Sequence, residues 1–283
     1  MIIALAQINF IVGDLEYNST KIIKAINESK KVNADLIVFS ELAICGYSPF
    51  DLLESKDFLD KVYIAINNIA QYSEDIGVII GATTINEGTG KMLFNSALFI
   101  HDKKIQKIVN KTLLPTYDIF DEYRYFESNN EFDIIEFKGK KIALTICEDL
   151  WDEQEKNLDF DKETIYRNSP MQMLSKLNPE FIVNIAGSPF SYNQAQTRKN
   201  ILVKNAIKYN LPIIYVNQVG ANTDLIFDGG SAVFNNRGEV ILSCKYFEED
   251  IRLINTNKIS ELPEIIETRN KYADINSALV LGL

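Results

Sequence analysis

Runs of consecutive apolar residues place the strongest constraint on the fold of this chain. In residues 181–185, Phe-Ile-Val-Asn-Ile, apolar side chains do not alternate with polar ones as they do in a strand that faces water on one side. Longer stretches between such runs have helical periodicity instead, as in residues 18–31, where Ile22, Ile23 and Ile26 share one face. Strands buried on both faces that alternate with amphipathic helices predict a mixed α/β fold.

The same patterns predict the bounds of individual elements. The expected strands are residues 2–7, 36–40, 78–83, 96–100, 105–110, 134–137, 142–146, 181–185, 213–217, 231–235 and 240–243. The expected helices are residues 18–31, 56–73, 165–177 and 194–209. A helix passes directly into a strand at residues 33–39 and again at 178–183, which indicates two similar halves. We therefore predict a four-layer α-β-β-α sandwich of two mixed sheets flanked by helices.

The charge and hydropathy of the chain argue against several classes of partner. Of its 283 residues, 29 are Lys or Arg and 39 are Asp or Glu, which gives a net charge of −10. An acidic surface repels phosphate backbones, so we expect no nucleic-acid partner. No apolar run reaches the roughly 18 residues that a membrane helix needs, and the first residues lack the basic leader of a signal peptide. We expect neither a membrane span nor secretion.

Cysteine and histidine usage narrows the chemistry further. Cys45, Cys147 and Cys244 have no metal-binding spacing, and His101 is the single histidine. We therefore expect no metal site and a reducing, cytoplasmic setting. Cys45 and Cys244 are expected in the core. His101, at the turn of a hairpin over residues 95–110, is expected to be exposed to solvent, so a carboxylate must serve as any catalytic base.

Three chemically active side chains follow predicted strands directly. Glu41, Lys111 and Cys147 each come immediately after an apolar run. Functional sites in α/β sheets gather at the carboxyl ends of strands, so we expect the three to meet. A thiol with a pKa near ~8.5 needs its proton removed before it attacks well. A buried carboxylate can take that proton, while an ammonium group and the backbone N–H of residue 148 stabilise the oxyanion. The trio predicts an acyl-transfer site without histidine.

The stretches around these residues form motifs. They are residues 4–9 with Gly13-Asp14, residues 38–42 with Gly46-Tyr47, residues 111–117 with Phe120-Asp121-Glu122, and residues 146–151. On these motifs the chain resembles the nitrilase (carbon–nitrogen hydrolase) superfamily over essentially its whole length. Residues 46–53, Gly-Tyr-Ser-Pro-Phe-Asp-Leu-Leu, and Ser188-Pro189-Phe190 make it most similar, within that superfamily, to the glutaminase domains of the glutamine-dependent NAD synthetases.

This resemblance implies a role for each catalytic candidate. Cys147 would be the nucleophile, Glu41 the general base, and Lys111 the group that holds the oxyanion. Glu122 matches an additional buried glutamate of the family, with a purely structural ion pair as the alternative. The implied reaction is hydrolysis of the glutamine side-chain amide through a γ-glutamyl thioester, which yields glutamate and ammonia.

Further residues match positions that contact glutamine in the synthetase glutaminases. They are Tyr117, Glu148 and Ser188, with Tyr47 as a candidate for the pocket wall. By charge, Glu148 suits the α-ammonium group of glutamine. One departure concerns Gln194, because related enzymes commonly carry Lys or Arg at that position. Either Arg198, one helical turn later, takes over the contact with the α-carboxylate, or it only caps the helix surface.

The resemblance also divides the chain. Residues 1–262 correspond to the glutaminase domain, and residues 263–283 to the start of a linker toward an ATP-dependent synthetase domain. The sequence has no Ser-Gly-Gly-x-Asp-Ser pyrophosphate loop, so the half that uses ATP and Mg is missing or is a separate protein. The implied substrate is L-glutamine, and the implied partner is a synthetase half that amidates deamido-NAD to NAD. We expect no cofactor in this chain and a homo-oligomer.

Other functions remain open from the sequence. One is a stand-alone amidase or nitrilase that acts on another small amide. A non-catalytic assembly or regulatory module is a second, although the intact set of Glu41, Lys111 and Cys147 argues against it. A redox or metal-binding protein is disfavoured by the cysteine and histidine counts. Ammonia release from glutamine, compared with other amides, separates the first alternative from a glutaminase.

Overall fold

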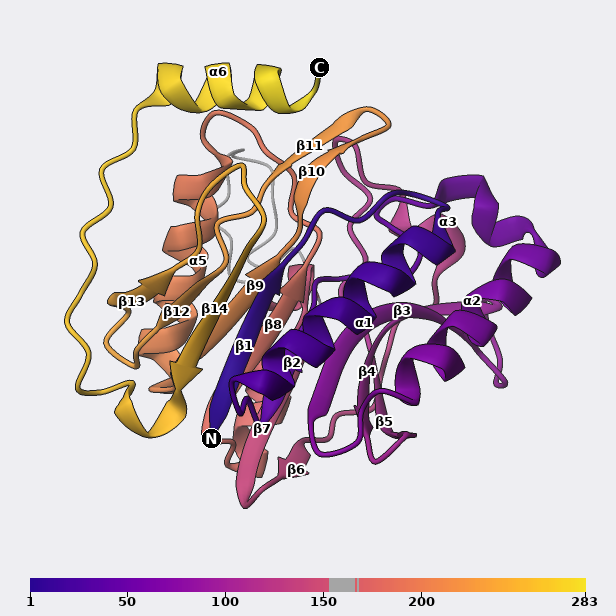
Figure 1. The fold of residues 1–283 in the computed structure, drawn as a ribbon, viewed down its shortest axis with the longest axis horizontal. Helices are drawn as coiled ribbons and strands as arrows, with labels where there is room; N and C mark the ends of the chain where they lie inside the picture. The colour runs from indigo at the N-terminus through magenta and orange to yellow at the C-terminus, as the bar shows by residue number, and fades with distance from the viewer. Residues whose placement is uncertain (153–165, 167) are drawn as a thin grey trace.

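Two mixed β-sheets packed face to face form the centre of the molecule in a computed structural model, which describes residues 1–152, 166 and 168–283 (Figure 1). The first six-stranded sheet has the order β14 (Asp250–Asn255), β1 (Ile2–Gln7), β2 (Leu36–Val38), β3 (Gly77–Ile85), β4 (Leu93–His101), β5 (Lys104–Asn110). The second has the order β13 (Val240–Ser243), β12 (Ala232–Phe234), β9 (Ile213–Asn217), β8 (Phe181–Ala186), β7 (Lys140–Ile146), β6 (Ile135–Phe137).

Helices cover the outer faces of both sheets and complete the four layers that the sequence predicts. The helices of the outer layers are α1 (Leu15–Lys31) and α2 (Lys56–Ala70) on the first sheet, and α4 (Pro170–Leu174) and α5 (Gln194–Tyr209) on the second. Short helical segments in the connections are α3 (Glu122–Tyr125) and the 3-10 turns η1 (Phe50–Glu54), η2 (Cys147–Leu150), η3 (Ser175–Leu177) and η4 (Thr256–Lys258). The predicted sandwich is confirmed.

Burial explains why the strands show no polar alternation. In β1, Ile3 and Leu5 pack in the core shared with the second sheet, whereas Ala4 and Ala6 pack under α1 and α2. Both faces of the strand are therefore dry, and a polar residue on either face would be buried without water.

The two sheets have the same internal plan, which confirms the two similar halves. In each sheet three parallel strands lie side by side, β1–β2–β3 in one and β7–β8–β9 in the other. One antiparallel strand flanks each trio on one side, and a pair of strands that are antiparallel to each other flanks it on the other. Because β4 and β5 reverse direction in turn, β5 again runs parallel to β2, so its carboxyl end lies at the same edge.

Two predicted helices begin at other residues than expected. The first starts at Leu15 rather than at residue 18, because the Asp14 side chain accepts a hydrogen bond from the N–H of Tyr17 and caps the helix. The helix predicted over residues 165–177 begins at Pro170, after the cap Ser169, while residues 165 and 167 lie outside the described residues.

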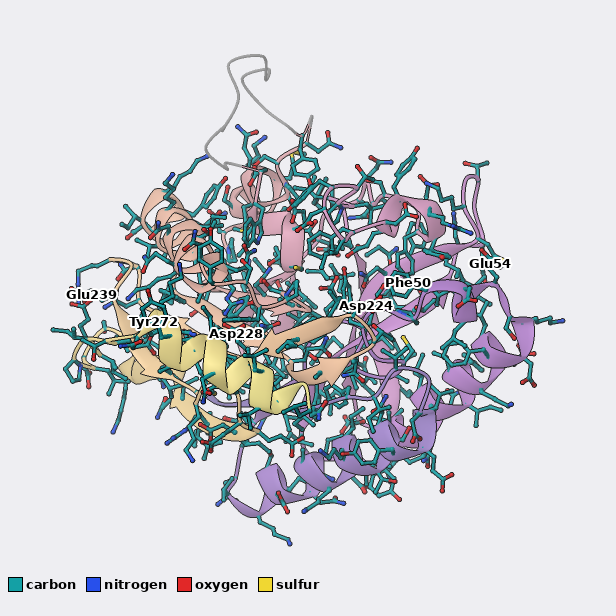
Figure 2. All side chains as sticks on the ribbon, turned by 90° about the horizontal axis from the view of Figure 1, so that it is seen from above. Phe50, Glu54, Asp224, Asp228, Glu239 and Tyr272 are labelled. Atoms are coloured by element: carbon teal, nitrogen blue, oxygen red, sulfur yellow. The ribbon has the colours of Figure 1, made fainter. Side chains whose placement is uncertain are left out.

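Other elements were not predicted at all. The hairpin of β10 (Val219–Asn222) and β11 (Leu225–Asp228) was missed because each strand has only 4 residues, and β14 was also missed. The terminal helix α6 (Lys271–Leu281) packs beside β11 and buries Ala278 alone, so it lacks a strong apolar stripe. Figure 2 shows α6 alongside this hairpin, whose tip carries Asp224.

The environment of His101 differs from the prediction. The residue does lie beside the turn between β4 and β5, but its side chain is only 25% exposed. Its centroid lies 4.9 Å from that of the Phe137 ring, in an edge-on contact between the ends of the two sheets. The sequence shows charged residues next to His101 at this turn, and nothing in it indicates the aromatic contact.

Candidate active site

The loops after β2, β5 and β7 bring the three predicted catalytic side chains together. Lys111 Nζ lies 2.7 Å from Glu41 Oε1, and both side chains are fully buried. Cys147 joins them, because the N–H groups of Thr112 and Ile146, which neighbour Lys111 and Cys147 in the chain, donate to the same carboxylate, Asp149. The Glu41 backbone packs closely against β3 at Gly81. A Cβ on Gly81 would lie 2.6 Å from the Glu41 backbone, so only glycine leaves room for it.

Three donors fix the orientation of the Glu41 carboxylate. Oε1 accepts hydrogen bonds from Lys111 Nζ and from Asn95 Nδ2, each at 2.7 Å. Oε2 accepts the backbone N–H of Gly187 at 2.7 Å, from the loop after β8 in the other sheet. Sheet, loop and lysine therefore hold this carboxylate in one position, as a general base requires.

Lys111 is shared between two carboxylates. Its Nζ also donates to Glu122 Oε1 at 2.7 Å, and the Tyr47 hydroxyl donates to the same oxygen at 2.7 Å. Burial alone would lower the pKa of Lys111, but the charges of Glu122 and Glu41 outweigh it and hold that pKa well above its usual range. Burial raises the pKa of Glu122, against the effect of Lys111. The lysine is therefore a permanent cation beside the thiol.

Cys147 begins the turn η2 in a left-handed backbone conformation, with φ of 42°. Its residue is 7% exposed, and burial followed by the negative charge of Glu41 raises the pKa of its thiol well above the usual value. Lys111 opposes that shift. The resting sulfur thus keeps its proton, and attack on a substrate requires a base that removes it.

Glu148, next to Cys147, forms a carboxylate site bounded by two tyrosines. The Tyr117 hydroxyl lies 3.0 Å from both carboxylate oxygens, and the Tyr166 hydroxyl donates to Oε1 at 2.7 Å. Burial raises the pKa of Glu148 to about 7, although both hydroxyl groups favour the ionised form. Tyr117 is 41% exposed, so this site adjoins the surface.

Ser188 lies at the end of β8 in a second buried network. Its N–H donates to Asn217 Oδ1 at 2.9 Å, and its hydroxyl accepts from Arg198 Nη1 at 3.3 Å. Arg198 Nη2 lies 3.0 and 2.9 Å from the two oxygens of Asp228. Arg198 is 3% exposed, so the expectation that it only caps the helix surface is wrong. Gln194 is half-buried at the first residue of α5.

Several partners of these groups escaped sequence reasoning. They are Asn95, Gly187, Asp149, Tyr166 and Asp228. The polar pair Asn95-Ser96 among the mostly apolar residues of β4 was the one available signal for Asn95, which is fully buried. The contact of Gly187 uses its backbone N–H, which no residue type reveals.

The remaining cysteines are core residues, as expected. Burial raises the pKa of Cys45 and that of Cys244 to about 12, and both are unpaired. Within residues 1–152, 166 and 168–283, no group of three or more His, Cys, Asp and Glu side chains is placed to hold a metal ion. No helix in the same described part of the chain is long and apolar enough to cross a membrane.

Comparison with known proteins assigns the family. Residues 2–261 match the family model described as carbon-nitrogen hydrolase. The chain belongs to this family. It is 36% identical over 295 residues to a glutamine-dependent NAD(+) synthetase of Synechocystis, which covers 99% of this chain and 51% of that protein. The corresponding protein of Acinetobacter baylyi is 33% identical over 99% of this chain and 49% of its own length.

Solved structures agree with this assignment. A glutamine-dependent NAD+ synthetase from Acinetobacter baumannii in complex with ADP superposes with a TM-score of 0.86 at 32% identity, over 99% of this chain and 51% of that one. A nitrilase-superfamily amidase from Nesterenkonia has a TM-score of 0.74 at 17% identity, over 90% of this chain and 89% of that one, and shows the fold alone. The chain spans about half the length of the curated relatives it matches.

Proposed function

We propose that this carbon–nitrogen hydrolase releases ammonia from the side-chain amide of L-glutamine. One observation carries the proposal: a buried carboxylate, Glu41, and a buried ammonium, Lys111, lie 2.7 Å apart beside the Cys147 thiol. This arrangement provides a nucleophile, a base and an oxyanion partner with no histidine. The relatives named glutamine-dependent NAD(+) synthetase support glutamine as the amide.

The reaction divides into two half-reactions. Cys147 Sγ attacks the amide carbon while Glu41 takes the thiol proton, and the Lys111 ammonium with the N–H of Glu148 stabilises the oxyanion. Glu41 then delivers the proton to the departing nitrogen, the C–N bond breaks, and ammonia leaves a γ-glutamyl thioester. A water molecule, deprotonated by Glu41, attacks the thioester and releases glutamate and the thiol.

Recognition of the amino acid would use the residues around this centre. Glu148, held by Tyr117 and Tyr166, would pair with the α-ammonium group. The Ser188 hydroxyl would bind the α-carboxylate, with Arg198 behind it as the donor that orients it. Tyr47 would form a pocket wall, since its ring packs so closely on Gly187 that a Cβ there would lie 2.9 Å away.

Three further assignments remain predictions. Arg198 would reach the α-carboxylate directly only through a guanidinium that Asp228 already engages. Gln194 would contribute a neutral hydrogen bond where related enzymes commonly carry a cation. Glu122 would act by holding Lys111 in place, rather than by touching the substrate.

The released ammonia would be the substrate of a second reaction, at a site that the described residues do not form. We propose that a synthetase part, on the same chain beyond residues 263–283 or on a separate protein, uses it with ATP and Mg to amidate deamido-NAD to NAD. Residues 1–262 would form the glutaminase domain without a cofactor of its own. A homo-oligomer in the cytoplasm is the setting we expect, in keeping with three unpaired cysteines.

An ammonia assay with a panel of amides tests this function. The wild-type chain should release ammonia and glutamate from L-glutamine, with much lower rates on asparagine, acetamide and benzamide. Cys147→Ala should abolish release while Cys45→Ala, a matched loss of a buried thiol, should keep it. Hydrolysis of another amide in preference to glutamine would favour a stand-alone amidase instead. Retained activity in Cys147→Ala would remove the mechanism.

A further inference from the structure

Asp149 lies two residues after the nucleophile and has no role in the reaction as described above. Its side chain is 2% exposed and accepts three backbone hydrogen bonds. Oδ1 accepts the N–H groups of Thr112 and Leu113, both at 2.9 Å, and Oδ2 accepts the N–H of Ile146 at 3.0 Å. Every one of these contacts is buried, so water does not compete for them.

These three bonds join two different sheets. Thr112 follows Lys111 directly as the chain leaves β5 of the first sheet. Ile146 is the last residue of β7 in the second sheet and precedes Cys147 directly. A single carboxylate thus ties the backbone next to the ammonium to the backbone next to the thiol.

We propose that Asp149 is a positioning residue that sets the spacing between the Lys111 ammonium and the Cys147 thiol. The inference rests on the proposed function of that site, because this spacing matters only for a reaction that uses both groups. Asp149 itself would touch neither the substrate nor the leaving group. Its effect would appear in the rate of thioester formation and leave substrate binding unchanged.

The chemistry of the three contacts calls for a carboxylate. All three partners are N–H donors, and a carboxylate offers acceptor atoms on both oxygens. An asparagine offers one acceptor oxygen and an NH₂ group, so one side of the bridge would set donor against donor. Cys147 also needs this support, because its φ of 42° is a conformation that costs a non-glycine residue about 1 kcal/mol or more.

Protonation of the Asp149 carboxylate would weaken the three-bond bridge, as its substitution by asparagine would. Burial raises the pKa of Asp149 to about 7, although the N–H groups of Leu113, Ile146 and Thr112 favour the ionised form. A protonated carboxyl group has lost one of its acceptors, so the bridge should loosen as the pH falls through this value. The reactivity of Cys147 should fall with it.

The test compares Asp149→Asn with Asp152→Asn, a neighbouring half-buried acid that is hydrogen-bonded to Ser169. For Asp149→Asn we expect kcat on glutamine to fall about 10- to 100-fold with KM within about twofold of wild type. The rate of Cys147 alkylation by iodoacetamide, compared at one pH above 7, should also fall in this variant. Asp152→Asn should match the wild type in all three readouts.

Further measurements distinguish a variant that fails to fold from a folded variant in which Cys147 is misplaced. Circular dichroism and thermal unfolding report whether Asp149→Asn is folded; if it is not, Asp149→Glu decides. That variant keeps both acceptor oxygens but adds a methylene, so kcat should fall at constant KM. A folded variant of either kind with wild-type kcat, or with a raised KM and unchanged kcat, overturns the proposal.

The alkylation assay also separates this proposal from the function on which it rests. Iodoacetamide reacts with Cys147 without any glutamine. If the wild type does not hydrolyse glutamine, the proposed function fails, and the alkylation rates of Asp149→Asn and Asp152→Asn still decide whether Asp149 positions the thiol. If glutamine is hydrolysed and both variants are alkylated at the wild-type rate, the positioning role alone fails.

Discussion

The part of the chain that the structure describes contains two buried clusters of a cation with carboxylates, and they differ in charge balance. In the first cluster, Lys111 lies 2.7 Å from Glu41 and 2.7 Å from Glu122. In the second, Arg198 pairs with Asp228 at 2.9 Å. All of these side chains are 4% exposed or less, so burial and pairing do not tell the two clusters apart.

The surplus carboxylate is what distinguishes the first cluster. One ammonium there serves two carboxyl groups, and the thiol of Cys147 lies in their field. Such a centre has an oxygen available to take up a proton, which the chemistry requires. The second cluster is a neutral pair in which both oxygens of Asp228 contact one guanidinium nitrogen, and it supports Ser188. We propose that charge imbalance beside a thiol, rather than burial, marks the site of reaction.

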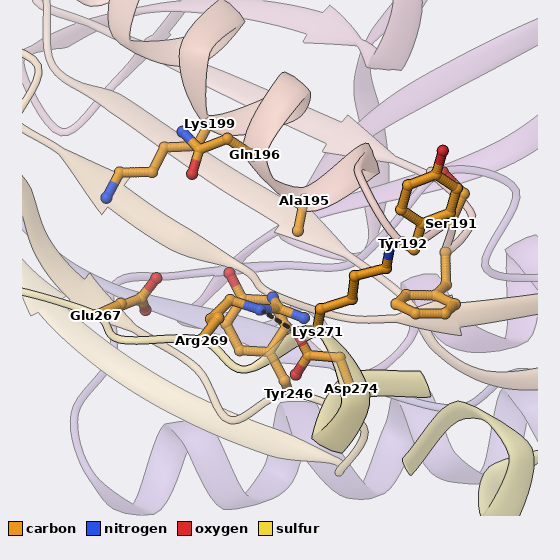
Figure 3. Close-up of a pocket in the computed structure, with 11 residues that line it drawn as sticks. Ser191, Tyr192, Ala195, Gln196, Lys199, Tyr246, Glu267, Arg269, Lys271 and Asp274 are labelled. Atoms are coloured by element: carbon orange, nitrogen blue, oxygen red, sulfur yellow. Dashed lines mark hydrogen bonds and ion pairs between the residues drawn. The ribbon is translucent and has the colours of Figure 1, made fainter. Parts of the chain in front are cut away.

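The second cluster also continues toward the end of the chain. Arg269 Nη1 lies 3.8 Å from Asp228 Oδ2, and its guanidinium stacks 3.5 Å from the centroid of the Tyr246 ring. Its Nε also lies 3.0 Å from Asp274, at the edge of a cavity of about 230 Å³ (Figure 3). Arg198 and Asp228 therefore connect Ser188 to the segment that follows β14. This is the position of an ion pair with a structural role.

The largest effect should come from removing the base of the first cluster. Glu41→Gln keeps the size of the side chain and an acceptor oxygen but cannot take the thiol proton. We expect kcat on glutamine to fall about 100- to 10,000-fold. The free energy of unfolding, measured in denaturant, should fall by about 1–3 kcal/mol, because the amide NH₂ would face one of the three donors that bond to Glu41. Activity close to that of the wild type would remove Glu41 from the mechanism.

The second cluster should show the opposite pattern. Arg198→Met leaves Asp228 buried without its main partner and should lower the free energy of unfolding by about 3–5 kcal/mol. The double variant Arg198→Met with Asp228→Leu should recover most of that loss, since it removes the pair as a unit. In steady-state assays the folded single variant should keep its kcat, with a higher KM through Ser188. A large loss of kcat with little loss of stability would make this cluster catalytic.

A smaller effect concerns the pH dependence of stability at Glu148. Burial raises the pKa of this carboxyl to about 7 in the folded protein, against roughly 4.3 in an unfolded chain. The folded state therefore binds this proton more tightly, and its stability falls as the pH rises between about 4 and 7.

Glu148→Gln removes that penalty. At pH 8 the variant should be more stable than the wild type by roughly 1–3 kcal/mol, and at pH 4 the two should be equal. Denaturant titrations at both pH values measure the difference, in which the contributions of Asp149 and Glu122 cancel. The same variant should bind glutamine poorly. Equal stability at pH 8 would show that Tyr117 and Tyr166 compensate fully for burial.

Local sequence predicted what depends on local sequence. Strands that are buried on both faces can be recognised by their consecutive apolar residues. The positions of Glu41, Lys111 and Cys147 follow from the strand that precedes each of them. The partners of these residues depend instead on register across sheets. Gly187 meets Glu41 through a backbone N–H, and Asp228 reaches Arg198 from a hairpin whose strands are too short to recognise.

The proposed mechanism requires that Cys147 is the cysteine that attacks the substrate. Covalent labelling of the three cysteines tests this requirement most directly. The wild-type chain is incubated with a diazoketone analogue of glutamine, and tandem mass spectrometry locates the adduct among the three cysteines. The account predicts an adduct on Cys147, none on Cys45 or Cys244, and protection by excess glutamine. An adduct on either of the other two, or glutamine turnover with Cys147 unlabelled, would contradict it.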